Sequence, residues 1–103
     1  MLYAEALNEN NNNPAALTEL DKIRNRAGLP NSTATSQADF RQAVQDERRL
    51  ELAFEGQRWF DLVRAGTVEA EMGQTISSDY FLFPVPTSEI FASFGVITQN
   101  PGY

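Results

Sequence analysis

The sequence predicts a mainly α protein. A helical pair and a longer broken helix are expected to carry an extended, proline-rich C-terminal tail packed on the helices. Two observations indicate the helices: apolar residues recur at three- and four-residue steps through much of residues 1–66, and glycine and proline interrupt that pattern. The tail stands apart because the run YFLFPVP at 80–86 is apolar on both faces and contains two prolines, which favours extended geometry over a central strand.

Residues 1–27 are predicted to form a helical hairpin. The first helix runs from Met1 to about Glu9, and the asparagines at 10–13 form a loop. Asn13 is placed to cap the second helix, with Pro14 at its first position, and Gly28 suits the end of that helix. The apolar stripe of the second helix consists of Leu17, Leu20, Ile23 and Ala27.

The pattern LYAEAL…A…L in this hairpin resembles one tetratricopeptide-type repeat. Such a helix pair buries its apolar face by stacking on neighbouring pairs. The first helix has one obvious partner helix and begins without a capping residue. We therefore expect its apolar face to be incompletely covered, which favours self-association or burial against another chain. That face consists of Leu2, Tyr3, Ala6 and Leu7.

Residues 36–66 are predicted to hold the longer helix and its broken extension. Ser36 followed by Asp39 is typical of a capping box, so the helix is expected to start there and to run to Phe54 or Glu55. Gly56 ends it, and a short fourth helix covers 57–65. The apolar stripe of the longer helix consists of Phe40, Ala43, Val44, Leu50 and Phe54.

Glu47 falls on this apolar stripe. A carboxylate in that position is buried or half buried, so it needs a compensating partner. Arginines lie nearby, and the sequence predicts a structural ion pair between Glu47 and Arg58, with Arg26 as the second choice.

Three carboxylates, Glu47, Glu51 and Glu55, follow one another at four-residue steps. Two carboxylates across a cleft can act as acid and base on a glycoside. However, a contiguous helical ladder provides neither an open cleft nor the differing environments that such a pair needs. Ion pairs with neighbouring arginines are the favoured interpretation, and the sequence assigns no catalytic residue.

An aromatic group, Trp59, Phe60 and Tyr80, also has two interpretations. Aromatic faces can stack on sugar rings, but these side chains also lie at helical or extended spacing suited to a core. The core interpretation is favoured because aromatic residues bury large areas.

A charged face formed by Arg58, Asp61 and Arg64 can dock a partner protein. The favoured interpretation is that this face forms ion pairs with glutamates of the longer helix.

Composition excludes several classes of protein. Fourteen acidic and 8 basic residues give a net charge of −6, which argues against binding to nucleic acid or to an anionic lipid surface. Cysteine and histidine are absent, so thiol nucleophiles, Cys/His zinc sites and Ser-His-Asp triads are excluded. No cofactor and no metal are predicted. No apolar run approaches the ~20 residues of a membrane-spanning helix.

The tail, residues 79–103, is expected to lie extended across the third and fourth helices, with Trp59 or Phe54 beneath it. Left in water, its apolar run would present a large exposed patch. Its expected role is to clamp the C-terminus onto the helices.

The stretch ERRLELAFEGQRWFDLVRAG, residues 47–66, resembles the C-terminal signature of the SusD/RagB-like outer-membrane nutrient-binding lipoproteins. Further segments fit the same pattern in the same order: LYAEALNE, ALTELDKIRNRAGLP, YFLFPVPTSEI and ITQNPGY. The resemblance covers most of the chain. Because members of that family are several times longer, it implies that residues 1–103 are a single C-terminal fragment of a larger protein.

The resemblance also implies a function. Such a protein binds a glycan, oligosaccharide or other nutrient at the cell surface and delivers it to a SusC-like TonB-dependent transporter, without hydrolysing it. Membrane attachment is implied only through an N-terminal lipid anchor, on a cysteine that this chain does not contain. No residue here matches a glycan-contact motif, so this segment is expected to be mostly scaffold. A helical-repeat module for protein–protein interaction is the alternative.

Overall fold

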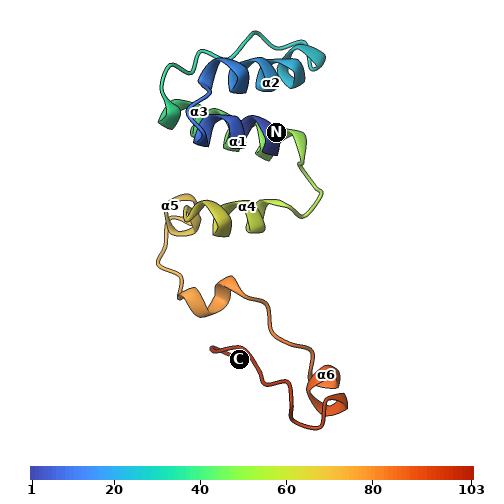
Figure 1. Cartoon of the computed structure of the whole chain (residues 1–103). Coiled ribbons are helices and arrows are strands. Elements are labelled where there is room, and N and C mark those ends of the chain that lie inside the picture. Colours follow the sequence, from blue (N-terminus) through green and yellow to red (C-terminus); the bar gives the residue numbers. More distant parts are fainter. The chain divides into compact units, whose positions relative to one another are not determined.

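The computed structural model describes all 103 residues and contains six α-helices, one 3₁₀ turn and no strand, which confirms the mainly α fold (Figure 1). The chain divides into two compact units, Met1–Asp61 and Leu62–Tyr103. The elements are α1 (Leu2–Glu9), α2 (Asn13–Arg26), α3 (Gln37–Glu51), α4 (Arg58–Ala65), α5 (Val68–Met72), the 3₁₀ turn η1 (Ser78–Phe81) and α6 (Thr87–Ala92). No helix is both long and apolar enough to cross a membrane.

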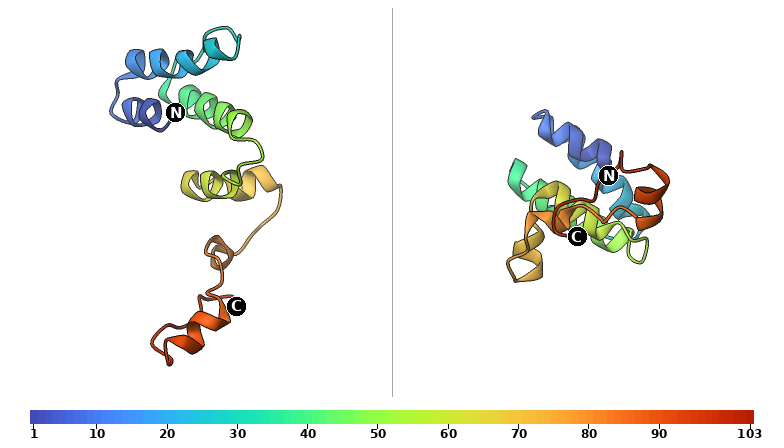
Figure 2. Two further views of the ribbon diagram at one scale, coloured as in Figure 1. Left: turned by 90° about the vertical axis from the view of Figure 1, so that its right-hand side faces the viewer. Right: turned by 90° about the horizontal axis from the view of Figure 1, so that it is seen from below.

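The core of the first unit lies where α1, α2 and α3 pack on one another (Figure 2). Each of the three helices contacts the other two, so α1 has two partner helices where the sequence suggested one. The fully buried apolar side chains of this core are Ala4, Ala16, Leu20, Phe40 and Val44.

The face that α1 buries differs from the one predicted. Ala4 and Asn8, one helical turn apart, are completely buried, whereas Leu2 and Tyr3 are 59% and 64% exposed. Small residues let α1 approach the other helices closely. Leu2 and Tyr3 therefore point outward and form an apolar outer face, whereas Leu7 packs partly buried against the core.

Asn8 connects the end of α1 to the start of α3 through two hydrogen bonds. Its side-chain nitrogen donates to the Gln37 carbonyl oxygen at 3.2 Å, and Nε2 of Gln37 donates to the Asn8 carbonyl oxygen at 2.8 Å. Each amide thus satisfies a backbone carbonyl of the other residue. This exchange satisfies the side-chain nitrogen of Asn8, which sequence periodicity did not place in the core, while its Oδ1 is buried without a hydrogen-bond partner.

The helical hairpin has the predicted bounds to within one residue. Asn12, not Asn13, occupies the capping position of α2, and its side chain makes no capping hydrogen bond. At the other end Gly28 adopts a φ of +73°, as expected of the residue that follows a helix.

The capping box of α3 is present as predicted. Ser36 Oγ accepts the backbone N–H of Asp39 at 3.1 Å, and the Asp39 carboxylate accepts the Ser36 N–H at 3.0 Å. Hydrogen bonds from Ser36 and then Thr35 hold the pKa of Asp39 below its ordinary value.

This box gives a pH-dependent prediction. Because the pKa of Asp39 is lowered in the folded protein, its stabilising effect is complete above the ordinary pKa and is lost as pH falls through the lower, folded value. Ser36→Ala should cost about 1 kcal/mol near neutral pH through loss of the cap. In urea titrations the difference between Ser36→Ala and the parent chain should shrink below a pH of about 4. An equal difference at all pH values would contradict this account.

The longer helix ends earlier than predicted. α3 ends at Glu51 with Leu52 as its cap, and the turn that follows holds two left-handed residues, Phe54 and Gly56, with φ of +69° and +72°. Leu50 and Phe54 are 70% and 107% exposed, so the predicted stripe was wrong at these two positions. The buried face of α3 steps from Phe40 to Val44 to Glu47 and does not include those two residues.

In the second unit, only part of the tail is extended, which corrects the prediction for residues 79–103. The 3₁₀ turn η1 and the helix α6 flank an extended stretch at 82–86. The packing of the tail on the third and fourth helices stays a prediction.

The last residues of the chain bind the backbone of the extended stretch, and we call Gln99, Asn100 and Tyr103 the C-terminal clasp. The Val85 N–H donates to Gln99 Oε1 at 2.7 Å, and Gln99 Nε2 donates back to the Val85 carbonyl at 3.0 Å. Asn100 donates to the Phe83 carbonyl, and the Tyr103 hydroxyl to that of Leu82. These bonds link two sequence segments that form no periodic pattern together.

The clasp predicts a local effect of substitution. Gln99→Ala removes the acceptor of the Val85 N–H and the donor to the Val85 carbonyl. Each lost hydrogen bond is worth about 1 kcal/mol. Amide hydrogen exchange at Val85, followed by NMR, should accelerate roughly five- to thirtyfold, since 1.4 kcal/mol is a factor of ten. Thr98→Ala, which alters an exposed neighbour outside the clasp, should leave that rate unchanged. Equal exchange rates in the two variants would refute the clasp.

Candidate functional site

Glu47 is buried, with 4% of its side chain exposed, and it forms an ion pair with an arginine, but the partner is Arg24. Nη1 of Arg24 lies 2.7 Å from Oε2 of Glu47. Sequence reasoning named Arg58 first and Arg26 second. Arg24 lies one helical turn after the buried Leu20, so it shares the face of α2 that meets α3. That spacing was a signal in the sequence that could have identified it.

Arg26, two residues further along α2, forms an ion pair with Glu51 instead. Two positions along a helix turn a side chain by roughly 200°, so Arg24 and Arg26 cannot share a partner face. Glu51 lies one turn beyond Glu47 on α3. Two successive glutamates of the ladder are therefore held by arginines of the hairpin, while Glu55 lies in the turn after α3 and outside the helix.

A third tie joins α1 to α3. Arg41 donates from Nε to one Glu9 oxygen at 2.7 Å and from Nη2 to the other at 2.5 Å. The hydrogen bond from Arg41 lowers the pKa of Glu9, and the same contact raises the pKa of Arg41. Both groups are exposed, so this pair contributes less to stability than the buried one.

Asp61 of α4 is held by Arg48 of α3 through a bidentate contact. Arg48 Nε donates to Oδ2 at 2.9 Å, and Nη2 lies 2.9 Å from Oδ1. Only 10% and 12% of the two side chains are exposed. The expected tie between α3 and α4 exists, with α3 supplying the arginine and α4 the carboxylate, the reverse of the predicted polarity.

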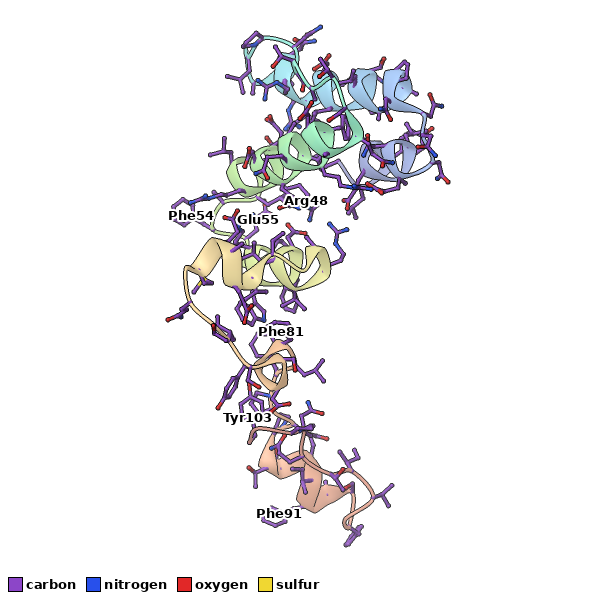
Figure 3. The ribbon with its side chains drawn as sticks, turned by 90° about the vertical axis from the view of Figure 1, so that its left-hand side faces the viewer. Arg48, Phe54, Glu55, Phe81, Phe91 and Tyr103 are labelled. Carbon is purple, nitrogen blue, oxygen red and sulfur yellow. The ribbon has the colours of Figure 1, made fainter.

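A cavity of about 360 Å³ opens beside this pair, at the turn between α3 and α4. Figure 3 labels Arg48, Phe54 and Glu55 at this turn. The charged and aromatic side chains that line this cavity are three arginines, one carboxylate and two aromatic rings. These residues are Arg48, Arg49, Phe54, Arg58, Trp59 and Asp61.

A second cavity, of about 440 Å³, lies between the loop after α2 and the middle of α3. Its wall mixes polar and apolar surface, with Arg24, Ser32, Asp39 and Asp46 among its residues. Arg24 and Asp39 are already engaged, in the ion pair with Glu47 and in the capping box.

The predicted aromatic core is wrong for two of its three members. Phe60 and Tyr80 are 54% and 49% exposed, while Trp59 is half-buried. In the second unit the Tyr80 ring packs edge-on against Tyr103, with centroids 5.7 Å apart. Exposed rings fit the stacking interpretation better than the core one.

The first unit therefore defines a helical, repeat-like scaffold held by a small apolar core and several carboxylate–arginine ties. Residues 1–77 match the model of the SusD family, and the chain belongs to that family. Over its whole length the chain is 30% identical, across 121 aligned positions, to SusD-like protein P2 of Formosa agariphila, of which it spans 24%.

A solved structure agrees. The crystal structure of a SusD-like protein from Bacteroides fragilis matches 97% of this chain with a TM-score of 0.75 and 30% identity. The chain covers 23% of that protein, so it spans about a quarter of the length of both relatives.

Proposed function

We propose that this chain is the C-terminal portion of a non-enzymatic nutrient-binding protein at the bacterial outer membrane. That protein captures a glycan or oligosaccharide at the cell surface and delivers it to a SusC-like TonB-dependent transporter, held by a lipid anchor outside this chain. The observation that carries the proposal is the family match over residues 1–77. Members of the family are generally binding proteins of the outer membrane.

Within that protein the segment serves mostly as scaffold. Three helices share one core, and arginine–carboxylate pairs join α1 to α3, α2 to α3, and α3 to α4. The glutamates that a hydrolase would use at this position, Glu47 and Glu51, are both engaged by arginines. This arrangement favours binding and support over catalysis.

Co-purification tests the delivery step. The chain would be affinity-tagged in its native reading frame, the outer membrane solubilised in mild detergent, and the bound proteins identified by mass spectrometry. We expect a TonB-dependent transporter in the eluate in near-stoichiometric amount. An eluate that lacks such a transporter, while the tagged protein is folded and in the outer-membrane fraction, would overturn the proposal of delivery.

The alternative, a helical-repeat interaction module, is favoured by one observation. The outer face of α1 exposes Leu2 and Tyr3, two large apolar side chains on adjacent positions. Leu2→Glu would leave transporter recovery unchanged if α1 only meets other parts of the same protein. Loss of one specific protein from the eluate, with the transporter retained, would instead support the module.

A further inference from the structure

The cavity at the turn between α3 and α4 differs in charge from the rest of the chain. Three arginines and one aspartate line it, whereas the chain as a whole carries a net charge of −6. The Arg48–Asp61 pair neutralises itself through its bidentate contact. Arg49 is exposed and forms no ion pair or hydrogen bond, so its guanidinium is available to an anion.

Aromatic rings frame the same cavity. Trp59 is half-buried in the wall, while the side chain of Phe54 is fully exposed, at 107%. Phe54 also holds a φ of +69°, a conformation that is strained for a bulky residue. The ring itself buries no apolar area in this unit, since its side chain is fully exposed. Strained backbone of this kind clusters at active sites and ligand-binding sites.

We infer that this cavity binds an acidic sugar, one that carries a carboxylate or a sulfate ester. The inference rests on the proposed function and narrows its ligand class. Arg49 is suited to a bidentate contact with the planar carboxylate of a uronic acid, or to a sulfate oxygen pair. The rings of Trp59 and Phe54 supply apolar faces for the C–H face of the pyranose.

The size and construction of the cavity agree with that ligand. A volume of about 360 Å³ lies at the lower end of the roughly 300–1,000 Å³ typical of ligand sites. The Arg48–Asp61 pair in its wall is nearly buried, so it ties Asp61 to α3 directly beside Arg49 and Trp59. The acidic remainder of the chain repels anions, which confines binding to this place.

Trp59 is the only tryptophan of the chain and lies in the wall of this cavity, so a ligand bound there should change the fluorescence of the chain. The test titrates the chain with three tetrasaccharides. One is built of galacturonic acid, one of sulfated galactose and one of unmodified galactose. We expect saturable changes with one or both acidic sugars and none with the neutral one. The comparison of the two acidic sugars decides between carboxylate and sulfate. Binding should weaken as salt rises, because the attraction is electrostatic.

Variants make the test specific. Arg49→Ala should weaken acidic-sugar binding about tenfold, as expected for one lost charge-assisted contact. Lys22→Ala removes the same charge from an exposed site on α2 outside the cavity and should leave affinity unchanged. Phe54→Gly should also weaken binding without loss of helical signal, because glycine accepts the positive φ.

Several results would overturn the inference. They are no saturable response to either acidic sugar, an equal response to neutral galactose, or equal losses in Arg49→Ala and Lys22→Ala. Transporter co-purification is independent of all three. A chain that recovers the transporter but ignores acidic sugars refutes this site alone, and a chain that binds them without the transporter refutes only delivery.

Discussion

Arg24→Met is expected to destabilise the first unit by about 3–5 kcal/mol, because it leaves the Glu47 carboxylate buried without its charge partner. Only 4% of the Glu47 side chain is exposed, so water cannot replace the lost guanidinium. Arg24 also donates from Nε to the Pro30 carbonyl at 2.9 Å, and that bond anchors the loop after α2. Urea unfolding followed by far-UV circular dichroism would measure the loss.

The reverse substitution should cost less. Glu47→Gln leaves Arg24, whose side chain is 23% exposed and can draw on solvent, and glutamine can still accept a hydrogen bond. We expect a loss of about 1.5–3 kcal/mol, typical of a hydrogen bond to a charged group. A domain is stable by only about 5–15 kcal/mol, so this milder variant stays measurable if Arg24→Met unfolds.

A double variant distinguishes the effect of the unpaired buried charge from a general loss of stability. Arg24→Met combined with Glu47→Leu replaces both charges by apolar groups and should recover most of the stability lost in Arg24→Met, because no buried charge remains. If Glu47→Gln proves costlier than Arg24→Met, or the double variant is worse than either, the burial asymmetry is not what governs this pair.

The sequence predicted the helices better than it predicted which side chains form ion pairs, and Glu47 shows why. Its position on an apolar stripe follows from the helical repeat alone, and the structure buries it. The choice among arginines depends on how α2 is rotated about its axis, and a shift of two positions changes which residue faces α3. Local periodicity does not determine how α2 is rotated about its axis. A buried residue of the same helix, such as Leu20, is needed to show which side of α2 faces α3.

The sequence predicted neither the end of α3 nor the C-terminal clasp, and the reasons differ. Leu50 and Phe54 continue a helical pattern, yet a left-handed turn at Phe54 breaks it, and apolar periodicity does not detect a turn that a non-glycine residue adopts. In the clasp, Gln99 meets Val85 through backbone atoms 14 residues away. Hydrogen bonds from side chain to backbone leave no periodic trace in a sequence.

The pairing of Arg48 with Asp61 predicts the second large effect, and it concerns the link between α3 and α4. Arg48→Met should cost about 3–5 kcal/mol, since it removes both hydrogen bonds of the bidentate contact with the Asp61 carboxylate, which is 12% exposed. Arg48→Lys keeps the charge but cannot reproduce two parallel N–H···O bonds, so it should fall between Arg48→Met and the parent chain. Arg49→Met, at the next and exposed position, is the matched control and should change stability by less than about 0.5 kcal/mol.

The site of the damage distinguishes this prediction from a general loss of stability. Trp59 lies two residues before Asp61 on α4, whereas most of the helical signal of the first unit comes from α1, α2 and α3. In Arg48→Met the fluorescence transition in urea should therefore precede the circular dichroism transition, because α4 separates before the three-helix core unfolds. In the parent chain the two transitions should lie closer together. Coincident transitions in Arg48→Met, at the midpoint of the parent chain, would show that the ion pair does not hold α4 in place.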